Sequence, residues 1–343
     1  LDRAGVAGSS PVLPTNAADN NPGFQILSFY PAYLNKVLMS FRIAFYALCF
    51  IALAACHGKS DRSDYAEEKA RAPFEAATSM GVITESSLDE ISGIVASRKY
   101  PGFYWAHNDS GGSPSVYLID SMAQLKAEVR LEGVINRDWE DIAIGPGLDE
   151  GYLLYVGEIG DNRAAYGNYS IYSFPEPELN ISEGVQSLGI SNFSTYQFQY
   201  PDGARDAETL LVDPTNRDII VISKRGDNVI VYHWPFAEQT PEPYVLHKVG
   251  GIPFWMIVSG DISPDGQELL LKNYESIFYW KKEPDVPWLE AIMTNPHRLP
   301  YQPEPQGEAV AFTTSGRGYV TLSEGKGFHD SQHLYFYRRK SEE

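Results

Sequence analysis

Cysteine is nearly absent from this chain of 343 residues, which contains only Cys49 and Cys56. The two thiols lie seven residues apart near the N-terminus. Two cysteines so close together provide neither a disulfide framework nor the four ligands of a structural zinc site. The fold must therefore be held together by its core.

Basic residues are also scarce relative to acidic ones. The chain has 27 Lys and Arg against 45 Asp and Glu, a formal net charge of −18. A surface of this sign repels a phosphate backbone, so we expect no nucleic-acid partner. Small cations and cationic partners are easier for such a protein to accommodate.

Apolar runs long enough to span a membrane are missing as well, and no helical periodicity of useful length appears after residue 78. The uncharged apolar run at residues 43–52 is shorter than the roughly 20 residues that a membrane-spanning helix needs. With 43% hydrophobic residues the chain is nevertheless rich enough in apolar side chains to form a sizeable core. The 29 Gly, 23 Pro, 22 Tyr and 16 Phe indicate short strands joined by tight turns. The length allows about two average domains or one large β-rich domain.

The N-terminal region has the layout of an export signal. Met39 is followed by the basic residue Arg42, the apolar run 43–52 and small residues before Cys56. Residues 53–56 (LAAC) resemble a bacterial lipobox, in which the cysteine is lipidated and the chain is cut just before it. A polar stretch from Gly58 follows, which favours a tether over a buried apolar helix.

These signals predict four segments. Residues 1–38 are expected to be a mis-extended, disordered start, 39–55 a lipoprotein signal peptide, 56–79 a tether and 80–340 the folded domain. Lipidation at Cys56 predicts a bacterial cell-envelope protein whose partner is a membrane. Because His57 rather than an aspartate follows the cysteine, the outer membrane is expected in a Gram-negative host.

A short phrase recurs five times after residue 80. Each copy is an apolar strand that begins at a polar residue or glycine and ends in a turn. The copies are residues 92–96 (SGIVA), 140–144 (EDIAI), 208–212 (ETLLV), 260–264 (GDISP) and 308–312 (EAVAF). Their starts are 48, 68, 52 and 48 residues apart.

Each phrase is followed by a second and a third β-rich segment. The second segments are 103–107, 152–156, 219–223, 269–271 and 319–322. The third segments are 116–119, 169–174, 229–234, 277–280 and 334–337. Three aligned strands per repeat, with room for a fourth, predict an all-β fold with a single β-propeller. A β-sandwich is the alternative, but it would not explain why the phrase recurs in phase.

We expect five blades, and the interval of 68 residues leaves six open. The last repeat has only three strands, while residues 81–84 are unpaired before the first. Closure by pairing this N-terminal strand with residues 334–337 would leave neither edge exposed.

Five strings in these repeats resemble a family of bacterial secreted and lipoprotein β-propellers. The strings are 105–112 (WAHNDSGG), 136–143 (NRDWEDIA), 157–162 (GEIGDN), 200–208 (YPDGARDAE) and 305–309 (PQGEA). The phrase is more distantly similar to phytase-like esterase, lactonase and strictosidine-synthase-type propellers. That resemblance implies inner-strand acidic residues that hold calcium in the central channel.

The candidate metal ligands lie at the start of the phrase. If each phrase is the innermost strand of a blade, Glu140, Glu208 and Glu308 meet at equal depth. The first and fourth copies carry Ser92 and Gly260 instead, with Glu90 and Asp261 as possible substitutes.

Crowded carboxylates either hold a proton or bind a cation. Ca²⁺ prefers oxygen ligands, and the amide oxygens of Asn108 and Asn162 would complete the set. The alternatives are local turn caps or ion pairs with Arg137, Arg205 or Lys224, and a role facing a substrate.

The second segments end in polar clusters that should meet at the same face. The candidate binding residues there are Asn108, Asp109, Asp161, Asn162, Lys224, Arg225, Lys272 and Glu324. Acidic and basic halves facing each other would suit a metal-bridged anion such as a phosphate ester or carboxylate. Solvated surface charge is the alternative. His107 or Glu158 could act as a general base, although a lone histidine beside Trp105 is often structural.

The sequence therefore predicts a propeller that binds a small, anionic ligand at its channel mouth. A calcium-dependent hydrolase acting on a phosphoester, ester or lactone is an alternative, and a protein-interaction scaffold is another. A propeller can host all three functions, so the choice depends on the geometry of the site.

Overall fold

The computed structural model describes residues 72–240, 243–325 and 332–341. The expected segments 1–38 and 39–55, the lipidation residue Cys56 and the tether up to residue 71 lie outside this part of the chain. None of the helices in the described ranges is long and apolar enough to cross a membrane.

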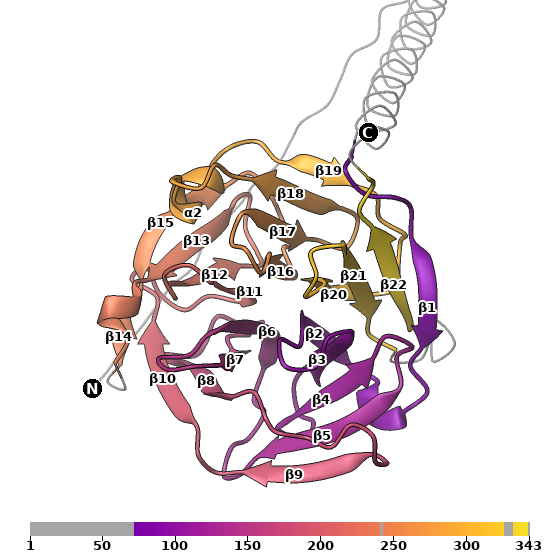
Figure 1. Cartoon of the computed structure of the whole chain (residues 1–343). Coiled ribbons are helices and arrows are strands. Elements are labelled where there is room, and N and C mark those ends of the chain that lie inside the picture. Colours follow the sequence, from indigo (N-terminus) through magenta and orange to yellow (C-terminus); the bar gives the residue numbers. More distant parts are fainter. Residues whose placement is uncertain (1–71, 241–242, 326–331, 342–343) are drawn as a thin grey trace, which may run out of the picture. The chain divides into compact units, whose positions relative to one another are not determined.

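The described residues form five mainly antiparallel sheets, arranged as blades around a common centre (Figure 1). Blade 1 contains β2 (Ile91–Ala96), β3 (Phe103–Asn108), β4 (Ser115–Asp120), β5 (Leu125–Leu131) and β9 (Gln186–Ile190). Blade 2 contains β6 (Trp139–Pro146), β7 (Tyr152–Glu158), β8 (Tyr169–Pro175), β10 (Ser194–Gln199) and β14 (Tyr244–Val245). Blade 3 contains β11 (Ala207–Val212), β12 (Ile219–Ser223), β13 (Val229–Trp234) and β15 (His247–Ile252).

The last two blades have four strands each. Blade 4 contains β16 (Ser259–Ile262), β17 (Glu268–Lys272), β18 (Ile277–Lys281) and β19 (His297–Leu299). Blade 5 contains β20 (Gly307–Phe312), β21 (Gly318–Ser323), β22 (His333–Arg338) and β1 (Thr78–Val82). Three short helical segments lie in the connections: η1 (Ser86–Leu88), η2 (Phe236–Glu238) and α2 (Trp288–Ala291).

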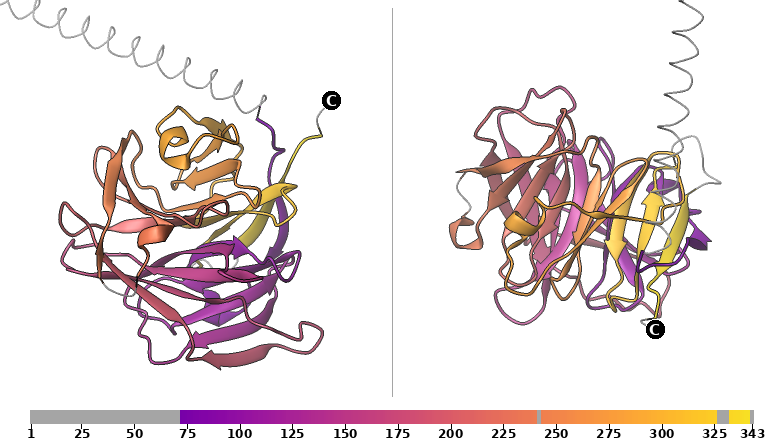
Figure 2. Two further views of the ribbon diagram at one scale, coloured as in Figure 1. Left: turned by 60° about the vertical axis from the view of Figure 1, so that its left-hand side comes forward. Right: turned by 90° about the horizontal axis from the view of Figure 1, so that it is seen from above.

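The prediction of an all-β propeller with five blades is confirmed. The long interval between the second and third phrases contains β9 and β10 instead of a sixth blade. Strand β9 returns to pair parallel with β5 of blade 1, and β10 pairs antiparallel with β8 of blade 2. Figure 2 shows the blades from two other directions.

Closure by the N-terminal strand is confirmed too. Strand β1 pairs antiparallel with β22, and Gly81 lies opposite Leu334 as the unpaired edges predicted. Packing extends before residue 80, because Phe74 is 1% exposed and forms a bridge to Arg339. Its ring contacts those of Tyr279 and Tyr319 edge-on, at centroid distances of 5.8 and 4.9 Å.

The core lies between neighbouring blades. The innermost strands β2, β11 and β20 are buried along their whole length, because both faces of each blade pack against another blade. Between blades 1 and 2, for example, Val95 and Trp105 pack with Ile142 and Leu154. This double burial explains why the phrases are almost continuously apolar.

A β-bulge recurs at the start of the innermost strand in four blades. The pairing register skips one residue there, and the skipped residues are Ser92, Glu140, Glu208 and Glu308. Blade 4 pairs without a bulge, with Ser259 opposite Lys272 and Gly260 opposite Leu271. A bulge redirects the extra side chain out of the regular alternation. The three glutamates therefore have equivalent positions at the same end of the ring.

The second strand of every blade ends at this same end. The register pairs there are Ile91 with Asn108, Trp139 with Glu158, Ala207 with Ser223, Ser259 with Lys272, and Gly307 with Ser323. We call the end where the innermost strands begin and the second strands finish the carboxylate face.

Candidate functional site

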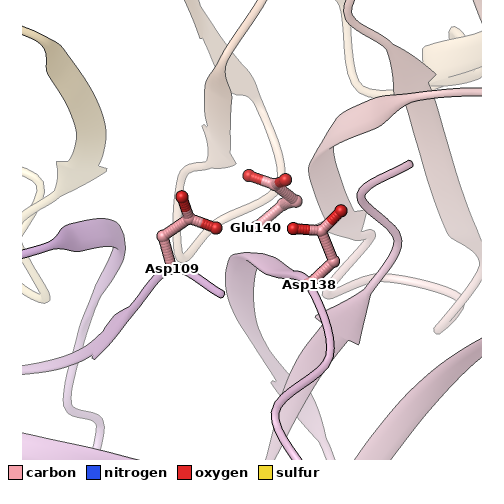
Figure 3. Close-up of side chains that lie close together, drawn as sticks. All are labelled: Asp109, Asp138 and Glu140. Carbon is pink, nitrogen blue, oxygen red and sulfur yellow. The ribbon is translucent and has the colours of Figure 1, made fainter. Parts of the chain in front are cut away.

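Three carboxylates converge on the carboxylate face, and we call them the first triad: Asp109, Asp138 and Glu140 (Figure 3). Asp109 directly follows β3, Asp138 directly precedes β6, and Glu140 occupies the bulge of β6. One oxygen from each lies within 4.8 Å of the others. Asp138 and Glu140 are 8% and 3% exposed.

The carboxylate of Glu140 has no partner among the described residues. A hydrogen bond from Ser92 Oγ reaches its backbone carbonyl at 2.8 Å, and none reaches its side-chain oxygens. Burial, followed by the charges of Glu208 and Asp109, holds the pKa of Glu140 well above its ordinary value. Burial, followed by the charge of Asp109, raises the pKa of Asp138 to about 6. The charge of Lys224 acts in the opposite direction but does not outweigh these effects. A buried carboxylate without a hydrogen bond is costly and calls for a proton or a cation.

A glycine leaves space in front of the first triad. A Cβ on Gly160 would lie 2.2 Å from Glu140 Oε1 and 2.6 Å from Asp138 Cγ. The backbone N–H of Gly160 donates to the Asp138 carbonyl at 3.2 Å, which fixes the glycine at this position. Any larger residue would displace the oxygens that converge here.

A second triad shares Glu140 and adds Asp206 and Glu208, again with oxygens within 4.8 Å. This triad already contains basic partners. Lys224 Nζ is ion-paired with Glu208 Oε1, and Arg225 Nε donates to Asp206 Oδ2 at 2.6 Å. Arg137 and Lys224 act on the first triad only through longer-range charge, and no ion pair to its carboxylates is found among the described residues, so it is the better candidate metal centre.

The other expected metal ligands are distributed differently. Tyr274 Oη donates to Glu308 Oε1 at 2.5 Å, and Glu324 lies beside Glu308. Burial, followed by the negative charge of Glu308, raises the pKa of Glu324 to about 9. The neighbouring carboxylate therefore favours the protonated form of Glu324. Glu90 contributes its backbone carbonyl, which accepts from the N–H of Asp109 at 2.7 Å.

Asp261 lies deeper in the ring, where it connects blades 4 and 5. Its Oδ2 accepts from the backbone N–H of Phe312 at 2.7 Å. Burial raises its pKa to about 7 despite the opposing charge of Arg98. Asp141, next to Glu140, makes a similar contact from blade 2 to the N–H of Leu210 in blade 3.

His107 is completely buried and contacts Trp139 edge-on at a centroid distance of 5.9 Å. Its Nδ1–H donates to the Asn108 carbonyl at 2.9 Å, and burial lowers its pKa to about 4. It is neutral and packed between blades, as expected for a histidine with a structural role. Asn108 Nδ2 donates to the Ser87 carbonyl at 2.7 Å, and Asn108 Oδ1 has no partner among the described residues.

Glu158 lies beside the first triad but outside it. Tyr172 Oη donates to one oxygen at 3.2 Å, and Arg137 Nη2 lies 3.5 Å from the other. Burial raises its pKa despite the charge of Arg137. Asp161 stabilises the loop after β7 by accepting from the backbone N–H groups of Ala165 and Tyr166.

The basic residues differ sharply in accessibility. Lys272 is 0% exposed, and its ammonium donates to the carbonyls of Asn273 and Gly307. The side chain of Lys224 is 8% exposed, whereas that of Arg225 is 48% exposed. Arg225 Nη2 also donates to Asn162 Oδ1.

Sequence reasoning did not select Asp138, Asp206 or Gly160. A signal for the two aspartates was present, because both stand two residues before a phrase glutamate, in Asp138-Trp139-Glu140 and in Asp206-Ala207-Glu208. Repetition of this Asp-x-Glu pattern in two blades predicts paired carboxylates. Gly160 gives no comparable signal, because its importance depends on contacts between separate loops.

No protein-family model and no curated protein sequence matches the chain. Among solved structures, the chain is similar to the Pan2 WD40 domain of Neurospora crassa. The two are 12% identical, the match covers 79% of this chain and 97% of the other, and the TM-score is 0.40. Similarity at this level says nothing about a ligand, and the propeller assignment follows from the sheet topology.

Proposed function

We propose that this propeller binds a divalent cation, Ca²⁺, at the first triad and uses the carboxylate face to hold a small anionic ligand. The observation that carries the proposal is the Glu140 carboxylate, which is buried, directed at two other carboxylates and without a partner among the described residues. Two unit charges at 4.8 Å repel by roughly 3 kcal/mol at an effective dielectric constant of about 20. A bound cation would convert this repulsion into attraction.

The donor set suits Ca²⁺ in chemical type. Ca²⁺ takes six to eight oxygen ligands in a flexible shell, and carboxylates bind it through one or two oxygens. Asp109, Asp138 and Glu140 would hold the ion, which leaves positions for water or for ligand oxygens. Bound there, the ion would supply positive charge to a face that otherwise repels anions.

The proposal is for binding rather than hydrolysis. Hydrolysis would need a base beside the cation that can reach a substrate. His107 is completely buried, and Glu158 is engaged by Tyr172 and Arg137. The cell-envelope location and the lipid anchor at Cys56 remain proposals that rest on the sequence of residues 39–56.

Thermal unfolding of the full chain in excess chelator and in millimolar calcium tests the proposal. A ligand at 100 times its Kd stabilises the native state by about 2.7 kcal/mol, which should raise the Tm by several degrees. Glu140→Gln should abolish most of this increase, because it removes the charge while preserving the shape.

Glu128→Gln is the matched control. Its carboxylate accepts from Ser115 Oγ at 2.8 Å in blade 1, a bond that glutamine can retain. This variant should respond to calcium like the unmodified chain. Equal Tm values for the unmodified chain in calcium and in chelator, once elemental analysis shows no retained metal, would refute the proposed function.

A further inference from the structure

Arg225 is an accessible cation beside the proposed calcium site. Lys224 is neutralised by Glu208, and Lys272 is buried and bonded to backbone carbonyls. The Arg225 side chain is nearly half exposed. Of the three basic residues that the sequence placed at this face, Arg225 is therefore the one that can meet a ligand from solvent.

The guanidinium of Arg225 is held in a fixed orientation. Its Nε donates to Asp206 Oδ2 at 2.6 Å, and its Nη2 donates to Asn162 Oδ1. Asp206 is itself held by the backbone N–H of Asp161, which donates to Oδ1 at 2.9 Å. Nη1 has no partner in the part of the chain that the structure describes. A planar guanidinium has five N–H donors, so several remain for an incoming acceptor.

Arg225 is also close to the proposed cation. Asp206, which it contacts directly, has an oxygen within 4.8 Å of an oxygen of Glu140. One carboxylate therefore separates the guanidinium from the ion-binding group. An anion with two or more oxygens could contact the ion through one oxygen and Arg225 through another.

We infer that Arg225 orients an oxyanion, a carboxylate or phosphate monoester group, that binds jointly to the guanidinium and the triad-bound cation. The inference rests on the proposed function. Guanidinium groups recognise both kinds of oxyanion through parallel N–H···O bonds, which a lysine ammonium cannot reproduce. Without the cation, the neighbouring carboxylates repel such a ligand. Anion binding should therefore depend on calcium, and each should strengthen the binding of the other.

Isothermal titration calorimetry of the full chain tests the inference. Calcium chloride is titrated first, and then sodium acetate and sodium glycerol 2-phosphate are titrated separately, each at saturating calcium and in chelator. At least one of the two anions should bind in calcium, and neither should bind in chelator. The stronger of the two identifies whether the recognised group is a carboxylate or a phosphate ester.

Arg225→Gln should weaken the calcium-dependent anion affinity at least about tenfold, because it removes a charged donor. Arg225→Lys should also weaken it, because the planar fork is lost. Lys248→Gln is the matched control, since Lys248 is 45% exposed and pairs with Asp202 at 2.8 Å in blade 3. Its anion affinity should equal that of the unmodified chain.

Failures of the two ideas are distinguishable. Absence of calcium binding would overturn the proposed function and this inference with it. Calcium binding with no binding of either anion would overturn the inference alone. So would anion binding in chelator, or an Arg225→Gln or Arg225→Lys variant that binds anions as tightly as the unmodified chain.

Discussion

Replacing Gly160 by alanine should disable the cation site with little change in the fold. The added Cβ would lie 2.2 Å from Glu140 Oε1, and ordinary contacts begin at 3.4 Å. The oxygen must therefore retreat by about 1.2 Å, the difference between these two distances. Ca²⁺–oxygen distances vary only from about 2.3 to 2.6 Å, so a displacement of this size removes the ligand. Asp138 must move as well, because its Cγ would lie 2.6 Å from the new atom.

The expected loss of calcium affinity is roughly 10- to 100-fold, the usual effect of changes that misorient metal ligands. This corresponds to about 1.4 to 2.7 kcal/mol of binding free energy. Stability in chelator should change little. The groups displaced are the ends of flexible side chains, and alanine reduces the conformational entropy of the unfolded chain.

Gly167→Ala is the control, because a Cβ there meets nothing within 4 Å and the residue lies on the same inter-strand connection. Calorimetric titration of calcium into both variants gives the comparison. If Gly160→Ala binds calcium as tightly as Gly167→Ala, the ion does not lie among the oxygens in front of Gly160, and the first triad is not the calcium site.

Three further predictions concern closure, pH and anchoring. Phe74→Ala should lower the free energy of unfolding by about 3 to 5 kcal/mol in denaturant titrations, because this ring is buried against Tyr279 and Tyr319. A loss below about 1 kcal/mol would contradict the place of Phe74 in the core. The Asp261 carboxyl, whose pKa is raised to about 7, binds its proton more tightly in the native state, so its contribution to stability is lost as pH rises from about 4 to 7. Asp261→Asn should remove that decline, on the order of 4 kcal/mol, and an unchanged pH profile would refute it. Labelling with radioactive palmitate should mark the chain through Cys56, and label retained in Cys56→Ser would rule out the anchor.

The blade architecture could be predicted from the sequence because the innermost strands are buried on both faces. That burial requires a short apolar phrase in every blade, and the phrase recurs in phase from Ser92 to Phe312. Closure was predictable for a related reason, since an unpaired strand at each terminus leaves two edges that can satisfy one another. Both features depend on local patterns that repeat along the chain.

The site was predictable only in part, because its chemistry depends on which charges become neighbours. Glu140, Glu208 and Glu308 occupy the same position of the repeated phrase, each at the β-bulge of its own blade, yet their surroundings differ. Lys224 neutralises Glu208, and Glu308 lies with Glu324 and Tyr274, whereas Glu140 faces Asp109 and Asp138. These differences arise from loops that the repeat does not determine.

The burial of each side chain could not be predicted from the sequence either. His107 and Asn108 end β3, a strand that is buried from Tyr104 onward, and the histidine ring packs against Trp139. Lys272 ends a second strand as expected, but it lies beneath the face, with its ammonium on the carbonyl of Gly307. Sequence placed these residues at the correct end of the ring without revealing which of them reach solvent.

The most direct test of the calcium site is a crystal structure of the full chain grown in calcium, with the ion located by its anomalous scattering. We predict one ion within about 2.3 to 2.6 Å of oxygens from Asp109, Asp138 and Glu140. This prediction would be contradicted if the space between these carboxylates held only water while calcium was present, or if the ion lay instead between Glu208 and Glu308.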